Sequence, residues 1–132
     1  MKEWTIIYRS RYSAWFEGSG EELQNEILAN LEVLKVMGPN LGRPRVDHVK
    51  GSEHQNMKEL RIQFKGDPVR ILFAFDPERR AVLLLGGDKT GDNRWYRENV
   101  PLADREFTLH LQEVQEKAKT KGHRKKEKEK KR

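Results

Sequence analysis

The sequence predicts an α+β fold, in which N-terminal helices pack on a small antiparallel sheet and a C-terminal helix follows the sheet. Three β-rich segments lie between residues 59 and 85, and only the short turns at 65–68 and 76–79 separate them. Connections this short join antiparallel neighbours, because parallel strands need a longer crossover. Residues 19–37 and 101–116 instead carry apolar side chains at helical spacing.

The composition fits one domain with a modest core. The chain has 132 residues, of which 35% are hydrophobic and 36% are charged. Cysteine is absent, which excludes disulfides, thiolate nucleophiles and cysteine-based zinc or iron–sulfur sites. Apolar runs are too short for a membrane span or a signal peptide, so we expect a cytoplasmic protein.

The N-terminal half predicts one strand and two helical segments. Residues 4–8 are β-branched and aromatic, which favours a short strand, and 10–16 favour a helical turn. Ser19 is the expected N-cap of a longer helix, and Gly38 with Pro39 is its expected end. The apolar stripe of that helix consists of Leu23, Ile27, Leu31 and Leu34.

The sheet begins after a polar stretch that contains one short strand near residues 46–50. In the first long strand apolar and polar residues alternate, which predicts one buried and one wet face. The wet face carries Glu59, Arg61 and Gln63. Residues 69–75 are mostly apolar and predict a central strand covered on both faces, and 81–85 form the third strand.

The C-terminal helix is predicted from Ala103, Phe107, Leu111 and Val114, with Pro101 near its start. Beyond residue 116 the apolar positions stop, so we divide the chain into a domain at 1–116 and a basic tail at 117–132. The tail has ten Lys or Arg and two Glu, whereas the domain has a net charge of −2. We expect the tail to be disordered or a frayed helix end, and either to attract RNA by counterion release or merely to solubilise the chain.

Arg70 is the most informative residue, because an arginine in an apolar strand must reach solvent, a ligand or an ion-pair partner. Antiparallel neighbours share faces, so Arg70 is expected beside Glu59 or Arg61, and Lys89 follows the third strand closely enough to join them. Two interpretations stay open. Arg70 either forms a self-sufficient pair with a glutamate or belongs to a cationic patch.

Such a patch would suit a phosphodiester, because arginine binds phosphate oxygens in bidentate fashion and stabilises a pentacoordinate transition state. RNA supplies its own nucleophile, the 2′-hydroxyl, so neither a serine nor a metal is required. Glu59 is our candidate base, and Lys89 or Tyr96 is the candidate acid or electrostatic group.

Residues around the patch offer further contacts. Arg94 and Arg97 flank Trp95 and Tyr96, an arrangement that suits base stacking, although Trp95 could equally pack into the sheet. His48 and His54 could reach the same face or remain solvated. No histidine–carboxylate spacing matches a metal site, so we expect no metal and no cofactor.

Three stretches together resemble one known family. They are KELR at 58–61, PVRILFAFDP at 68–77 and LLGGDKTG at 84–91. Over residues 4–115 the chain is similar to toxins of the RelE/HigB group of type II toxin–antitoxin systems, in particular to the phage-derived branch of the RelE/ParE superfamily.

The resemblance implies a microbial-RNase-like fold and metal-independent cleavage of mRNA in the ribosomal A site. It also implies a HigA-like helix-turn-helix antitoxin, and it implies that the toxin contacts operator DNA only through this antitoxin.

By position, Arg70 corresponds to the phosphate-contacting arginine of the family, and Lys89 corresponds to a basic residue after the last strand. Glu59 and Arg61 occupy its catalytic positions on the preceding strand, and Trp95 or Tyr96 the place of its C-terminal aromatic residue. Lys58 is a candidate RNA contact with Arg94, Trp95 and Arg97.

Two other functions remain open from the sequence. ParE-like relatives share the fold but poison DNA gyrase, a role for which the basic positions Arg61, Arg70 and Lys89 are not required. Alternatively, the chain is a basic RNA- or ribosome-binding module that acts through its tail.

Overall fold

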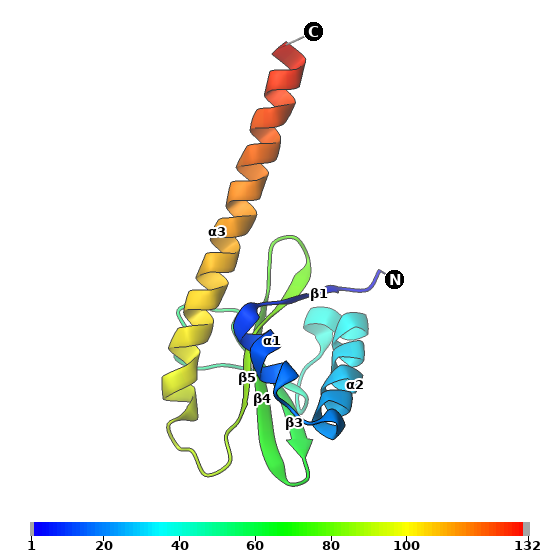
Figure 1. The fold of residues 1–132 in the computed structure, drawn as a ribbon, viewed down its shortest axis with the longest axis vertical. Helices are drawn as coiled ribbons and strands as arrows, with labels where there is room; N and C mark the ends of the chain where they lie inside the picture. The colour runs from blue at the N-terminus through cyan, green and yellow to red at the C-terminus, as the bar shows by residue number, and fades with distance from the viewer. Residues whose placement is uncertain (1, 131–132) are drawn as a thin grey trace.

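The computed structural model describes residues 2–130 and has the predicted α+β architecture (Figure 1). In chain order the elements are β1 (Thr5–Tyr8), α1 (Ser10–Glu17), α2 (Glu21–Met37), the 3₁₀ turn η1 (Gly38–Asn40), β2 (Val46–His48), β3 (Lys58–Phe64), β4 (Asp67–Phe75), β5 (Arg80–Asp88) and α3 (Trp95–Lys130). The strands that the sequence predicts are therefore present, and the expected turn at 10–16 is a helix of eight residues.

The five strands form one sheet in the order β1-β5-β4-β3-β2. Strands β2 to β5 are an antiparallel meander, which confirms the prediction from the short turns. Strand β1 pairs in parallel with β5 at the opposite edge, since the chain crosses through α1 and α2 before it enters the meander. The sheet is therefore antiparallel except at one edge.

Both faces of the sheet are covered. Helices α1 and α2 lie on one face, where they pack on Leu60, Ile62 and Ile71. Helix α3 lies on the other face, where Leu72 and Val82 meet its apolar side (Figure 1). Strand β4 is buried on both sides, as its nearly continuous apolar sequence predicts.

The junction between α1 and α2 differs from the expectation. The hydroxyl of Ser19 donates to the carbonyl of Trp15 at 2.9 Å and so closes α1. The N-cap of α2 is Gly20, so no side chain caps this helix, and the prediction that Ser19 does so is wrong. The predicted end at Gly38 is confirmed, and a Cβ there would lie 2.3 Å from Nε1 of Trp4.

Helix α3 is longer than the sequence predicts. It begins at Trp95, before Pro101, and continues through the tail to Lys130, past the end of the sheet (Figure 1). We expected disorder or a frayed end from residue 117 onward. Lysine, glutamate and arginine have high intrinsic helix propensities, so a charged segment can continue a packed helix. Residues 131–132 of the tail lie outside the described residues.

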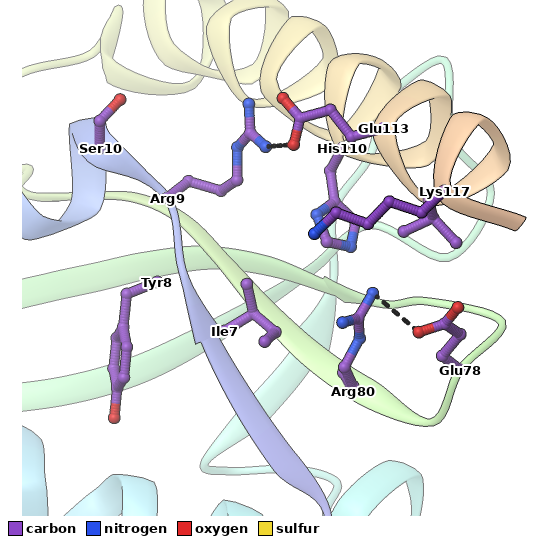
Figure 2. A pocket seen from close by; sticks show the side chains of 10 residues that line it. Ile7, Tyr8, Arg9, Ser10, Glu78, Arg80, His110, Glu113 and Lys117 are labelled. Carbon is purple, nitrogen blue, oxygen red and sulfur yellow. Dashed lines mark hydrogen bonds and ion pairs between the residues drawn. The ribbon is translucent and has the colours of Figure 1, made fainter. Parts of the chain in front are cut away.

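Ionic contacts hold α3 against the body of the protein. The buried carboxylate of Asp76, at the end of β4, accepts hydrogen bonds at 2.8 Å from Nε2 of His110 and from Nε of Arg80. On the same side Arg9 donates to Glu113 of α3 at 2.8 Å (Figure 2). These contacts fix the middle of α3 over the sheet.

Candidate functional site

Glu59, Arg61 and Arg70 form a cluster on the α3 side of the sheet, which we call the Arg–Glu cluster. Arg61 of β3 lies directly opposite Arg70 of β4, and Glu59 precedes Arg61 by two residues on the same face. The Nε atoms of Arg61 and Arg70 lie 3.7 and 3.9 Å from the same oxygen, Oε1 of Glu59. The structure thus brings these three predicted residues together.

The hydrogen-bonding capacity of the cluster is only partly used. Arg70 is 5% exposed and Glu59 is 7% exposed, whereas Arg61 is exposed. Nη1 of Arg70 donates to the carbonyl of Val69 at 3.0 Å, but Nε of Arg70 and Oε2 of Glu59 are buried without a hydrogen-bond partner in the described part of the chain. Because the ion-pair distances are too long for hydrogen bonds, the arginine–glutamate pair does not satisfy itself.

Tyr96, in the first turn of α3, adjoins the cluster. Burial raises the pKa of the Tyr96 hydroxyl, the Glu59 carboxylate raises it further, and the Arg70 guanidinium opposes both effects. The ammonium of Lys89 lies 5.5 Å from the centroid of the Tyr96 ring. The Lys89 backbone amide also donates to the carbonyl of Pro68 at 3.1 Å, which fixes the loop after β5 beside β4. All five predicted catalytic residues therefore lie at one end of the α3 face.

Trp95 packs into the sheet and is not free to stack on a base. It is 5% exposed, and its indole lies against the backbone of Gly87, the residue opposite Arg70 in β5. A Cβ at Gly87 would lie 2.7 Å from the indole Nε1. Trp95 is thus a core residue, and the expectation that it stacks on a base is wrong.

The other predicted RNA contacts do not join the cluster. Lys58 precedes Glu59, so it points to the opposite face, where its ammonium lies 5.3 Å from the centroid of the Phe75 ring. Side chains alternate along a strand, and Lys58 therefore faces α1 and α2 rather than the cluster. Arg94 and Arg97 are exposed at the start of α3.

The predicted histidines also lie apart. Nε2 of His54 is 2.9 Å from the hydroxyl of Thr108, which ties the loop before β3 to α3. His48 is exposed on the edge strand β2. Within residues 2–130 no group of three His, Cys, Asp or Glu side chains is arranged to hold a metal ion. In the same part of the chain no helix has the length and apolarity that a membrane span needs.

A groove that extends from the cluster contains residues that the sequence analysis missed. A cavity of about 310 Å³ is lined by Pro44, Arg45, Arg61, Gln63 and Arg70. The Arg45 carbonyl accepts a hydrogen bond from the Arg61 amide at 2.7 Å, so Arg45 is held beside the cluster. The predicted strand near residue 46 was a signal for this position, but its pairing with β3 is a tertiary contact that the spacing does not reveal.

Comparisons with known proteins give consistent matches. Residues 14–108 match the model of the family described as phage derived protein Gp49-like. Two Mycobacterium tuberculosis proteins named as candidate toxins are similar in sequence. HigB2 is 47% identical over 108 residues, which are 80% of this chain and 54% of that protein. HigB3 is 46% identical over 100 residues, 75% of this chain and 86% of that protein. The chain therefore spans about half the length of HigB2.

Solved structures support the same fold. The isolated Escherichia coli RelE toxin matches with a TM-score of 0.52 at 9% identity, over 72% of this chain and 94% of that chain. The toxin–antitoxin complex RelBE2 from Mycobacterium tuberculosis contains a chain that matches with a TM-score of 0.50 at 11% identity, over 65% of this chain and 98% of that one. At these identities the likeness shows a shared fold alone.

Proposed function

The chain belongs to the phage-derived Gp49-like family, which confirms the resemblance found in the sequence, and on this basis we propose that it is the toxin of a type II toxin–antitoxin system that cleaves mRNA. The observation that carries the proposal is the Arg–Glu cluster at the end of a groove lined by three arginines. Guanidinium groups at this density suit a phosphodiester, because each can bind two phosphate oxygens.

The arrangement of the cluster supports cleavage of RNA by attack of its 2′-hydroxyl on the adjacent phosphate. In this mechanism the carboxylate of Glu59 takes the proton of the 2′-hydroxyl as the O2′–P bond forms. Arg61 and Arg70 balance the negative charge that develops on the pentacoordinate phosphorus. The P–O5′ bond then breaks, and the products are a 2′,3′-cyclic phosphate and a 5′-hydroxyl.

The leaving 5′-oxygen needs a proton, and Tyr96 is the best candidate to supply it. Its hydroxyl carries a proton at neutral pH, because a tyrosine pKa is ordinarily about 10 and burial raises it here, and the same residue adjoins both Glu59 and Arg70. Lys89, beside the Tyr96 ring, adds positive charge near the leaving group. Glu59 is thus the base, Tyr96 the acid, and the cations stabilise charge.

We further propose that the substrate is mRNA in the ribosomal A site, in the cytoplasm, and that a HigA-like helix-turn-helix antitoxin neutralises the toxin. The similarity to two proteins named as HigB toxins supports an antitoxin of the HigA type. Operator DNA would be contacted through that antitoxin.

Mapping of transcript 5′ ends after induction tests the proposal. The parent should arrest growth and create new 5′ ends within coding regions only while translation continues. Arg61→Ala should lower their yield at least tenfold, since Arg61 is exposed and its loss should not prevent folding. Arg105→Ala, which removes an exposed arginine of α3, is the matched control and should behave like the parent. Growth arrest without new 5′ ends would instead indicate a toxin that does not cleave mRNA.

A further inference from the structure

Gln63 continues the row of polar residues that starts with Glu59 and Arg61 on the α3 side of β3. Successive residues on one face of a strand lie about 7 Å apart, since each residue advances the strand by about 3.4 Å. This step is comparable to the separation of neighbouring phosphates in an extended single strand. An RNA with its cleaved phosphate at the cluster would therefore have an adjacent nucleotide beside Gln63.

The side chain of Gln63 is exposed and weakly held. Its Nε2 donates to the carbonyl of Gly66 at 3.4 Å, a long hydrogen bond that a ligand can replace at little cost. The residue opposite in β4 is Pro68, whose short side chain cannot pair with an amide. The primary amide offers a donor beside an acceptor, which suits the edge of a nucleobase.

Arg45 lies in the same groove, on the far side of Arg61 from Arg70. Its Nη1 donates at 3.5 Å to Oδ1 of Asn30 in α2, the helix on the opposite face of the sheet, which is again a weak contact for an exposed arginine. A guanidinium that leaves this contact and turns into the groove can bind a phosphate that flanks the cleaved one. No acidic side chain is among the five described residues that line this groove.

We propose that Arg45 and Gln63 form a subsite for the nucleotide next to the cleaved bond, in which Arg45 binds the flanking phosphate and Gln63 reads the base. The inference rests on the proposed function and adds sequence preference to it. The ligand is a single-stranded ribonucleotide whose base presents a donor beside an acceptor.

The test compares Gln63→Ala with Gln112→Ala, which truncates an exposed glutamine of α3. After induction, 5′-end mapping should show that Gln63→Ala reduces the preference for one base at one flanking position by about tenfold. Gln63→Glu, which keeps the size but removes the amide donor, should change the preferred base. Gln112→Ala should leave the distribution of cleaved sequences unchanged.

Binding measurements separate the role of Arg45 from that of Gln63. Fluorescence anisotropy with short 2′-O-methyl RNA, which lacks the nucleophile, should show that Arg45→Ala weakens binding to all sequences equally and lowers the salt dependence by about one phosphate contact. Arg105→Ala should change neither quantity.

The outcomes distinguish the inference from the proposed function. If the parent cleaves mRNA but both Gln63 variants keep the parental distribution of sites, the subsite is wrong and the ribonuclease assignment stands. A base-dependent loss of binding in Arg45→Ala would also contradict the assigned roles. If the parent creates no new 5′ ends, the proposed function fails first and the subsite fails with it.

Discussion

Arg70→Ala should damage both the stability of the protein and its cleavage of mRNA, for reasons that can be separated. Glu59 is 7% exposed in the parent, and the substitution leaves its carboxylate with Arg61, at 3.7 Å, as the remaining cation. Breaking a buried ion pair costs about 3–5 kcal/mol. Arg61 is exposed but still compensates the carboxylate, so we expect a value near the lower end, about 3 kcal/mol.

Urea denaturation measures the stability effect. With an m-value of about 2 kcal/mol/M, typical of a small protein, the unfolding midpoint of Arg70→Ala should fall by about 1.5 M. Cleavage should fall by about a hundredfold, because Arg70 is also a charge-stabilising group in the proposed transition state. This loss should relieve the growth arrest.

The double variant Glu59→Gln/Arg70→Met distinguishes the two effects. It removes both buried charges and keeps similar side-chain volumes, so stability should return to within about 1 kcal/mol of the parent. Cleavage should not return, since both the base and a phosphate ligand are missing. If the double variant is as unstable as Arg70→Ala, the stability argument from the buried pair is refuted. If folded Arg70→Ala arrests growth and cleaves transcripts as the parent does, the site itself is wrong.

Three further variants probe the acid, the docking of α3 and the placement of the site. Tyr96→Phe should slow cleavage at least a hundredfold with little change in the urea midpoint, because it removes only a hydroxyl. Asp76→Ala should cost about 3–5 kcal/mol by urea denaturation, since it leaves the partners of a fully buried carboxylate, His110 among them, without their acceptor. Burial alone would raise the pKa of Asp76, but hydrogen bonds from His110 and Arg80 lower it overall. The Asp76 carboxylate should therefore stabilise the fold fully above its unfolded-state pKa of about 3.9, and this contribution should be lost as the pH falls through the folded-state pKa. Gly87→Ala should cost about 1–3 kcal/mol and reduce cleavage, because the new methyl group displaces Trp95 and with it the first turn of α3.

Strand alternation accounts for most of what could be predicted about the site. It placed Glu59 and Arg61 on one face, and the antiparallel meander placed Arg70 beside them. The same alternation would have placed Lys58 on the opposite face, so this error was avoidable from the sequence. Arg45 was not predictable in this way, because its position depends on the pairing of β2 with β3 across a polar loop.

The burial of Trp95 shows which information the sequence pattern lacked. An indole at the start of a helix suits either a base or a core, and only the space above a neighbouring strand decides between them. Here that space exists because Gly87 has no side chain. The pattern identified the aromatic pair, but the contact that divides their roles is tertiary.

The two adjacent glycines of β5 explain how the core and the site depend on each other. A Cβ at Gly86 would lie 2.3 Å from the ring of Trp15 of α1, and one at Gly87 would lie 2.7 Å from that of Trp95 of α3. Neighbouring residues of a strand face opposite sides, so each glycine admits one indole from the helix that covers its face. Packing of Trp95 on Gly87 in turn places the next residue, Tyr96, beside the Arg–Glu cluster. The glycine pair is thus required at once for close packing on both faces and for the position of the proposed acid, which is a physical reason for the GGDK sequence at the end of β5.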